Sequence, residues 1–337
     1  MDEEEEDEEE DEDETKDILS MPIKSQQTEA PAMVPDLPMG RPRLLLVDGH
    51  SYAYRAFYAI RRLNSPSGQP TNAIYGFIRM LTKIKEIVRP THLVVMWDGG
   101  NAEERMTLLP QYKQQRKEMP SDMEVQLDQI VSWLKASNFG SYIKDGCEAD
   151  DCIAAMTRKA SAAGYEVVIA SSDKDFMQLV SDHVWLHIPT DKENPLWGRE
   201  HVRAKSGVDP EQIVDWLALI GDTVDNIPGV PGVGPKTASD LLKHFGSIDG
   251  IYLRLEEVSS ERLRASLHAS AEVTRRNQEL VRLNDKVECG PELEELKVRE
   301  GDFDALHHLY ERWGFRTLLH ELQQAQLKKT DFFNQNA

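Results

Sequence analysis

Three short apolar runs in the first half of the chain have the pattern of strands that are buried on both faces. They are LLLVD (residues 44–48), HLVVMWD (92–98) and EVVIASSD (166–173), and each ends in an aspartate. Continuous apolar runs, rather than alternation of apolar and polar residues, are typical of parallel strands covered by helices. The three runs therefore predict central strands of a parallel sheet.

The segments between these runs have helical periodicity. The clearest one places Met123, Leu127, Ile130, Val131 and Leu134 on one face of a helix. Alternation of strands and helices predicts an α/β fold with a mostly parallel central sheet flanked by helices. In such folds ligands gather at the carboxyl ends of the strands, where the three aspartates lie.

The rest of the chain, from Pro210 to about Lys328, has the pattern of helices rich in Leu, Glu and Arg. We expect three parts: a disordered acidic tail (1–40), an α/β core (41–220) and a helical C-terminal region (221–328). No long linker separates the last two, so we expect them to pack as one unit.

The charge is distributed unevenly. Fourteen of the first seventeen residues are acidic and one is lysine, so only −7 of the net charge of −20 belongs to the remainder of the chain. Such a block predicts a solvated, disordered tail, with mimicry of nucleic acid or recruitment of a basic partner as the alternative. Because the folded part is only mildly acidic, a nucleic acid partner is not excluded.

The cysteine spacing and the hydropathy pattern indicate the redox environment of the protein and whether it crosses a membrane. Cys147, Cys152 and Cys289 lack paired CxxC spacing, which predicts a reducing environment and no disulfide. No apolar run reaches the roughly 18 residues that cross a membrane, so we expect no membrane partner. The acidic N-terminus is also unlike a basic signal or transit peptide.

Acidic residues recur at the boundaries of apolar segments in five places. They are Asp48, Asp98, Glu148, Asp150, Asp151, Asp173, Asp175, Asp222 and Asp225. Any one of them alone can be a helix cap, and the pair in EADD can simply start a solvated helix. If all nine converge, however, they repel one another and need cations.

Hard oxygen ligands without His or Cys favour Mg²⁺, with Mn²⁺ as a substitute, over zinc. Two such ions about 4 Å apart activate a water and stabilise the leaving oxygen of a displacement at phosphorus. The acidic residues therefore predict hydrolysis of a phosphodiester.

The segment GDTVDNIPGVPGVGPKTA (221–238) joins two of these acids to a glycine-rich run. Gly229 and Gly234 have P-loop spacing, but Pro235 stands where the lysine should follow, and no apolar strand comes directly before. A tight hairpin between two helices, the second of which begins near Pro235, fits better. Its exposed amides and Lys236 would then bind phosphates of a nucleic acid.

A basic segment would complete such a site. QYKQQRKEMP follows Arg105 and places four residues at helical spacing: Tyr112, Lys113, Arg116 and Lys117. Arg55, which follows Asp48 in DGHSYAYRAF, is a further candidate. The alternative is an ordinary solvated polar face. The basic cluster therefore indicates a nucleic-acid contact only in combination with the acidic residues.

These motifs, in this order, resemble the 5′ nuclease domain of bacterial DNA polymerase I and the wider flap endonuclease family. The motifs are VDGHSYAYRAFYA, the strand ending at Asp98, YKQQR, EADD, SSDKD and GDTVDNIPGVPGVGPKTA. The likeness covers about residues 43–316. Because no polymerase segment follows in this sequence, it resembles a free-standing member with a PIN-like core.

The resemblance implies metal-binding roles for all nine acids. It also implies that Arg55, Lys113 and Arg116 contact the scissile region, with Lys113 and Arg116 on an arch through which a single-stranded 5′ end passes. It implies 5′ to 3′ exonuclease and 5′ flap endonuclease activity in replication or repair. It also implies a helix-hairpin-helix that binds DNA and a potassium ion. The residues expected to contact DNA are Tyr112, Gly229, Val230, Gly232, Gly234 and Lys236.

The expected partners are DNA with 5′ flaps or 5′ ends, and RNA primers, bound by a monomer. Two positions depart from the family pattern: GGNAEER follows Asp98 where a more basic segment is usual, and Ser172 replaces a glycine. The acidic tail is unlike bacterial members. We expect an intracellular compartment that contains DNA: a plastid or mitochondrion if a presequence is missing, otherwise nucleus or cytoplasm.

Two other functions stay open at this point. The first is a non-catalytic module that binds DNA junctions, although binding alone gains nothing from nine repelling carboxylates. The second is a PIN-type RNase, for which a hairpin that holds a duplex would be unnecessary.

Overall fold

A five-stranded parallel sheet forms the centre of the computed structural model, which describes residues 40–100 and 102–335. Its strands, in the order β3-β2-β1-β4-β5, are β3 (Gly140–Ile143), β2 (His92–Trp97), β1 (Arg43–Asp48), β4 (Glu166–Ala170) and β5 (Val184–His187). The three apolar runs are thus confirmed as central strands and paired in parallel. The predicted tail lies outside the described residues except for its last one.

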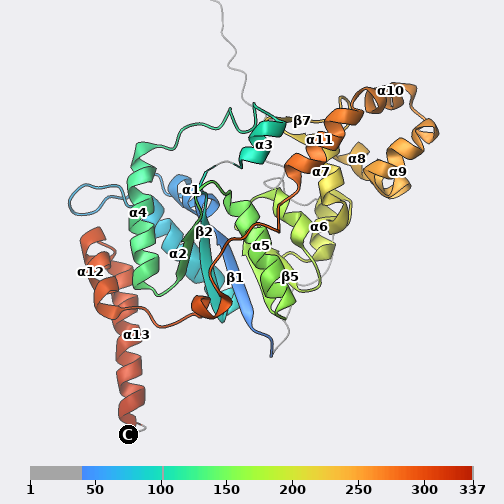
Figure 1. The fold of residues 1–337 in the computed structure, drawn as a ribbon. Coiled ribbons are helices and arrows are strands. Elements are labelled where there is room, and N and C mark those ends of the chain that lie inside the picture. The colour runs from blue at the N-terminus through green and yellow to red at the C-terminus, as the bar shows by residue number, and fades with distance from the viewer. Residues whose placement is uncertain (1–39, 101, 336–337) are drawn as a thin grey trace, which may run out of the picture.

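Helices cover both faces of the sheet (Figure 1), which confirms the predicted α/β class. Along β1, Leu45 and Val47 contribute to one hydrophobic core, and Leu44 and Leu46 contribute to the other. The alternation follows from the two-residue period of a strand. Because both faces are covered, β1 is apolar at every position between its first and last residue.

The first core lies between the sheet and helices from both ends of the chain. These helices are α1 (Gly49–Ala59), α2 (Asn72–Val88), α4 (Ser121–Ala136), α12 (Phe303–Trp313) and α13 (Arg316–Gln335). The periodic residues 123–134 are confirmed as part of α4. Figure 1 shows α12 beside α4, and Trp133 of α4 donates a hydrogen bond to the Tyr310 hydroxyl at 2.9 Å.

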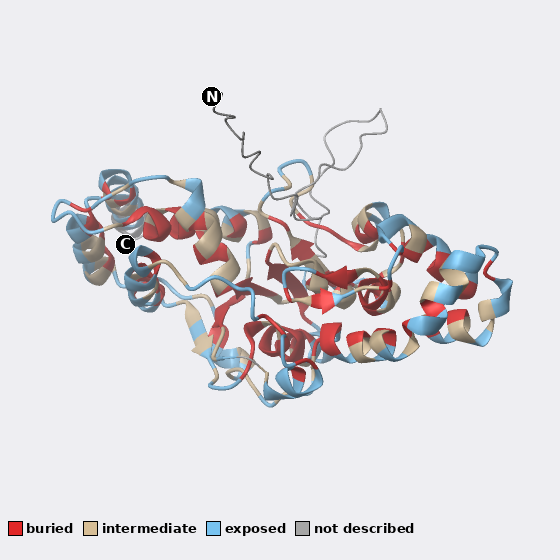
Figure 2. Ribbon diagram, turned by 90° about the horizontal axis from the view of Figure 1, so that it is seen from above, coloured by how far each residue is buried: buried red, intermediate tan, exposed pale blue. Residues whose placement is uncertain are grey.

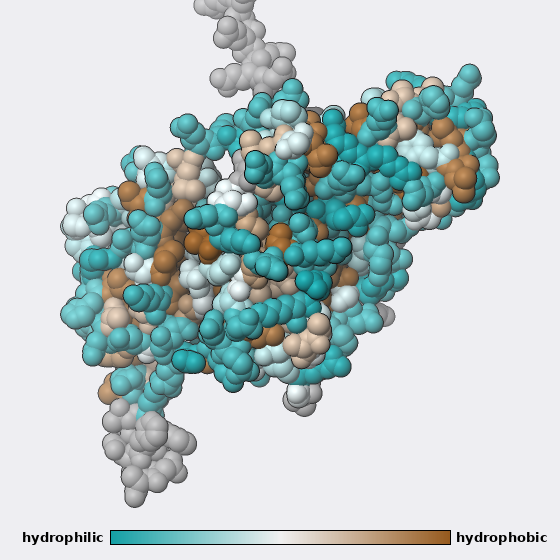
Figure 3. Space-filling model, viewed as in Figure 1, coloured by the Kyte–Doolittle hydropathy of each residue, from teal (hydrophilic) through white to brown (hydrophobic). Residues whose placement is uncertain are grey.

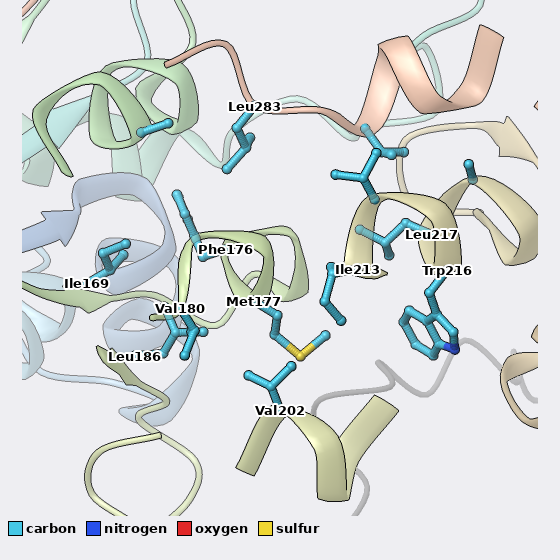
Figure 4. Packing of buried hydrophobic residues seen from close by; sticks show 14 of the residues in the cluster. Ile169, Phe176, Met177, Val180, Leu186, Val202, Ile213, Trp216, Leu217 and Leu283 are labelled. Atoms are coloured by element: carbon cyan, nitrogen blue, oxygen red, sulfur yellow. The ribbon is translucent and has the colours of Figure 1, made fainter. Parts of the chain in front are cut away.

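The second core extends from the sheet into the helical region. Its elements include α5 (Ala149–Ala162), η2 (Lys174–Leu179), α6 (Arg199–Ser206), α7 (Ile213–Ile220), α8 (Pro235–Phe245), α9 (Ile248–Leu253), α10 (Glu261–Ala269) and α11 (Ala271–Val281). Figure 4 shows Met177, Val202 and Ile213 pointing toward one another from η2, α6 and α7. Apolar contacts therefore join the helical region to the sheet.

The remaining elements are short: α3 (Glu103–Leu108), η3 (Pro210–Gln212), η4 (Leu255–Glu257), η5 (Leu293–Leu296), and the two-residue strands β6 (Gly221–Asp222) and β7 (Ile227–Pro228). Figure 2 shows buried residues concentrated along the sheet and the helices beside it, with exposed residues at both ends of the molecule. The division at residue 220 stays a prediction.

One expectation about local structure is wrong. Residues 112–117 were expected at helical spacing, but they form turns and extended chain between α3 and α4. Lys113 has φ of 56°, and its N–H donates to the Asp225 carbonyl at 3.2 Å. A tertiary contact thus replaces the hydrogen bond that a helix would have required.

No helix of the described part is long and apolar enough to cross a membrane. The surface in Figure 3 is mostly hydrophilic, with a band of hydrophobic residues over and beside α4. A groove of about 560 Å³ lies in this region, and its apolar lining includes Leu127, Val131, Phe139 and Ile143.

Candidate active site

A cleft of about 620 Å³ opens at the carboxyl ends of the central strands, where the sequence predicted a site. Six of the nine predicted acids line it: Asp48, Asp98, Asp150, Asp173, Asp222 and Asp225. They come from the end of β1, the residue after β2, the first turn of α5, the loop after β4, and the segment formed by β6 and the turn that follows it. The fold thus gathers carboxylates from five separate segments of the chain into one cleft.

Local hydrogen bonds fix the directions of these carboxylates. Asp48 accepts from the Ser51 N–H at 3.0 Å with one oxygen and from the Ser171 hydroxyl at 2.8 Å with the other. Asp98 accepts from the Ala149 N–H at 2.8 Å, which ties the end of β2 to the start of α5. Asp48 therefore has two roles, because the side chain that caps the N-terminus of α1 also lines the cleft.

Burial and mutual repulsion change the acidity of the group. The pKa of Asp150 lies well above its ordinary value, mainly because the carboxyl is buried and secondarily because Asp173 and Asp48 are negatively charged. Burial and nearby carboxylates also raise the pKa of Asp173 to about 6. Asp98 differs, because hydrogen bonds from His50 and Ala149 outweigh its burial and lower its pKa. Ionised side by side, these carboxylates require positive charge.

Cationic side chains supply part of that charge. Lys174 Nζ lies 3.0 Å from Asp222 Oδ2, and Arg116 Nη2 lies 2.7 Å from Asp225 Oδ1. No three His, Cys, Asp or Glu side chains of the described residues are gathered closely enough to hold a metal ion. The carboxylates instead face the cleft, in an arrangement that hard divalent cations would draw together.

Two predicted acids lie behind the cleft and form a separate buried network. Arg105 donates to Glu148 Oε2 at 2.8 Å and to both oxygens of Asp151 at 2.7 and 2.9 Å. It also donates to the backbone carbonyls of Leu280 and Arg282. Sequence reasoning noted Arg105 only as a neighbour of the basic segment, because its partners are distant in the chain.

The predicted basic residues have three different placements. Lys113 is buried with Nζ 3.0 Å from Glu148 Oε2, and the buried Tyr112 hydroxyl donates to the same oxygen at 3.3 Å. Arg116 lines the cleft, together with Lys117. Arg55 is half-buried on α1 and is not among the cleft-lining residues. Asp175, which is half-buried in the first turn of η2, is not among them either.

Sequence reasoning missed two basic residues that line the cleft. His50 lies 3.3 Å from Asp98 through Nδ1, and Lys174 pairs with Asp222. Both stand inside motifs that attract notice for their acids, DGH and SDKD. Their position within two residues of a predicted site aspartate was the signal that could have found them.

The glycine-rich run forms the predicted hairpin between two helices, α7 and α8. Pro235 is the first residue of α8, as expected, and Gly232, Gly234 and Lys236 are exposed. Val230 is buried, so only its backbone could face a ligand. The Asn277 amide donates to the carbonyls of Ala218 and Pro228, which anchors the hairpin to α11.

Two glycines of the hairpin give a matched prediction. A Cβ at Gly229 would lie 2.1 Å from the Ile220 carbonyl oxygen, whereas a Cβ at Gly234 would have nothing within 4 Å. Gly229→Ala should therefore destabilise the protein by about 2–4 kcal/mol, and Gly234→Ala should leave its stability unchanged. Urea unfolding of both variants measures this, and equal stabilities would contradict the close packing of the hairpin.

Two family models match consecutive parts of the chain. Residues 43–207 match the family model of the 5′-3′ exonuclease N-terminal resolvase-like domain. Residues 208–304 match the model of the 5′-3′ exonuclease C-terminal SAM fold. The chain therefore belongs to the 5′-3′ exonuclease family, and it is a hydrolase that acts on DNA phosphodiester bonds.

Individual relatives support this assignment. The 5′-3′ exonuclease of Aquifex aeolicus is 38% identical over 83% of this chain and 94% of its own length. DNA polymerase I of Bacillus subtilis is 37% identical over 84% of this chain, which spans 32% of that protein. Among solved structures, the bacteriophage T5 5′-exonuclease shares the fold, with a TM-score of 0.58 at 22% identity over 86% of this chain and 99% of its own.

Proposed function

We propose that the chain is a divalent-metal-dependent, structure-selective 5′ nuclease, which removes 5′ flaps and 5′ ends from DNA in replication or repair. The observation that carries this proposal is the cleft at the carboxyl ends of the strands. Six carboxylates line it, and burial together with nearby carboxylates raises the pKa of three of them, Asp48, Asp150 and Asp173. Such a cluster is typical of sites that hold two hard cations. We propose Mg²⁺ as the natural ion, with Mn²⁺ as a substitute.

The six cleft-lining carboxylates would hold the ions. When bound, two such ions lower the pKa of a water and stabilise the leaving oxygen at phosphorus. A structure of a bacteriophage T5 flap endonuclease in complex with DNA and metal ions has the same fold, with a TM-score of 0.59 at 22% identity over 85% of this chain and 98% of its own. The metal-binding role of each acid in this chain, including Glu148, Asp151 and Asp175, stays a prediction.

Basic residues beside the cleft would position the substrate. Arg116, with 45% of its side chain exposed, is able to exchange Asp225 for a phosphate oxygen. Lys117 and Lys174 also line the cleft and would offset phosphate charge. Lys113 lies deeper, against Glu148, so its contact with the scissile region requires movement of residues 109–117.

The hairpin would bind the duplex beside the junction. Its exposed backbone at Gly232 and Gly234 and the side chain of Lys236 offer phosphate contacts that read no base sequence. A potassium ion at residues 230–234, cleavage of RNA primers and a monomeric state belong to the same proposal. The predicted location in a compartment that contains DNA stays a prediction.

Cleavage of a 5′-labelled flap duplex at low salt tests this function. With Mg²⁺ we expect cutting near the junction of single and double strand, and EDTA should reduce it to background. An otherwise identical flap made of RNA serves to compare substrates. Binding of the flap duplex without cutting in Mg²⁺ and in Mn²⁺ would favour the junction-binding module instead, and cutting of single-stranded RNA alone would favour the PIN-type RNase.

A further inference from the structure

All three cysteines of the chain meet at the first turn of α5. The sulfur atoms of Cys147 and Cys152 lie 3.3 Å apart, and the Cys152 thiol also interacts with the thiol of Cys289. Cys289 belongs to a segment that follows α11, far along the chain from Cys152. The fold has therefore brought together a pair of sequence neighbours and a distant third thiol.

The segment that carries Cys289, residues 282–292, runs along α5 and is called the strap below. It leaves the C-terminal end of α11 and descends beside α5 in Figure 1. Three of its hydrogen bonds to α5 or to the loop before it are Asn284 N–H to Asp151 (2.8 Å), Arg158 to the Asp285 carbonyl (2.8 Å) and Lys144 to the Glu288 carbonyl (2.6 Å). These contacts hold Cys289 against the helix.

The packing of the strap is close around the cysteine. A Cβ at Gly290 would lie 2.4 Å from the Met156 sulfur, so the backbone next to Cys289 touches the side of α5 directly. The strap is also connected to the buried network, because Arg105 binds the Arg282 carbonyl and Asp151 binds Asn284. A bond between the strap and α5 would therefore act on residues next to the cleft.

The three thiols differ in accessibility. Cys147 and Cys152 are buried, with 8% and 2% of their surface exposed, whereas Cys289 is only half-buried. A hydrogen bond with Cys152 and the nearby charge of Lys144 also lower the pKa of Cys289. Because thiolates are the reactive form, Cys289 is the thiol that a small oxidant in solution would meet first.

We propose that the three cysteines form an oxidation site, in which a hydroperoxide oxidises Cys289 and Cys152 then closes a disulfide with it. In the first step the Cys289 sulfur attacks the peroxide, the O–O bond breaks, and a sulfenic acid forms as water or an alcohol leaves. In the second, the Cys152 sulfur attacks that of Cys289, the S–O bond breaks, and water leaves with the Cys152 proton. Two thiols and one hydroperoxide thus give one disulfide, water, and a second water or an alcohol.

Cys147 provides a second position for the disulfide. Its sulfur is 3.3 Å from that of Cys152, so it can displace Cys289 by thiol–disulfide exchange. A disulfide needs a sulfur separation of about 2.05 Å, and closing it draws the two sulfurs together. Cys147 and Cys152 flank the motif of Glu148, Asp150 and Asp151, so this motion displaces acids of the proposed site.

The effect on activity rests on the proposed function. Displacement of a site carboxylate by a fraction of an ångström to about 1 Å should lower cleavage on the order of tenfold to a hundredfold. A dithiol reductant should restore the activity, because it returns all three cysteines to thiols. Oxidised methionine, in contrast, is not repaired by a dithiol.

To test the proposal, the full chain is treated with hydrogen peroxide, and half of the oxidised protein is then reduced with dithiothreitol. Each sample is divided between two measurements. Peptide mapping by mass spectrometry locates any disulfide, and cleavage of the labelled flap duplex with Mg²⁺ measures activity. Cys289→Ser is the variant that removes the reactive thiol, and Cys147→Ser is its matched control. Reduced, both variants should cleave as the wild type does.

We expect a disulfide on Cys152 in the oxidised wild type, loss of cleavage, and recovery with dithiothreitol. Cys289→Ser should resist the oxidant, and Cys147→Ser should still form the disulfide between residues 152 and 289. Absence of any disulfide among the three cysteines, or equal oxidant sensitivity of Cys289→Ser and wild type, overturns the proposal. Peptide mapping needs no nuclease activity, so a disulfide in a chain that never cleaves DNA would refute the proposed function and leave the oxidation site standing.

Discussion

Asp150→Asn is expected to lower flap cleavage by about a hundredfold or more while binding of the flap duplex is retained. Asp150 lines the cleft, and the charges of Asp173 and Asp48 act on it directly. Its substitution therefore removes one carboxylate of the proposed metal site and leaves the other five in place. The measurement is single-turnover cleavage of the labelled flap with Mg²⁺, beside a binding titration in EDTA.

The same variant should be more stable than the wild type when no metal is bound. Burial and nearby carboxylates raise the folded-state pKa of Asp150, so the fold favours its protonated form and stability is lost as pH rises through that pKa. Asparagine removes this penalty, and in EDTA near neutral pH the midpoint of thermal unfolding should rise by about 2 °C. The difference should shrink as pH falls toward the ordinary aspartate pKa of 3.8.

Asp304→Asn is the control, because Asp304 is an exposed acid in the first turn of α12 and does not line the cleft. It should cleave as the wild type does, and its thermal stability should not rise in EDTA. Wild-type cleavage by Asp150→Asn would remove the main support for the two-metal site. A simultaneous loss of activity and stability would mean that Asp150 has a structural role rather than the proposed one.

The sequence was sufficient to predict the sheet and the position of the cleft. Apolar runs that end in aspartate require only the two-residue period and the rule that parallel strands present their carboxyl ends together. Asp48, Asp98 and Asp173 were placed correctly on this basis. The hairpin was also predictable, because Pro235 and the glycines permit few other conformations.

Other features depend on contacts between distant segments, which one sequence does not contain. The turn at Lys113 replaces the expected helical spacing because the backbone there binds Asp225, which belongs to the turn between β6 and β7. The meeting of Cys289 with Cys152 depends on the course of the strap. Neither propensity nor periodicity carries information on such pairs.

Arg105→Ala is expected to destabilise the protein by about 3–5 kcal/mol, the usual cost of leaving buried charges without their partner. Arg105 has 7% of its side chain exposed, and it pairs with Glu148 and Asp151, which have 2% and 5% exposed. Without the guanidinium, these two carboxylates stay buried beside each other with fewer donors. Two backbone carbonyls, of Leu280 and Arg282, lose a donor as well.

Urea unfolding measures this loss, and Arg203→Ala is its matched control. Arg203 also binds two carboxylates, those of Glu200 and Asp209, but 46% of its side chain is exposed. Exposed pairs contribute about 0–1 kcal/mol, so Arg203→Ala should change the unfolding free energy little. Equal effects of the two substitutions would contradict the buried network.

A double-mutant cycle separates the charge from the packing of Arg105. Asp151→Asn alone removes one charge from the network but leaves Arg105 without a full partner, so it should destabilise the wild type. In the Arg105→Ala background the same change removes an unpaired buried charge, and it should restore part of the lost stability. Asp151 also accepts a hydrogen bond from Asn284 of the strap. The unfolding free energy that the double variant regains relative to Arg105→Ala therefore measures how strongly the charges of this network couple α3, α5 and the strap.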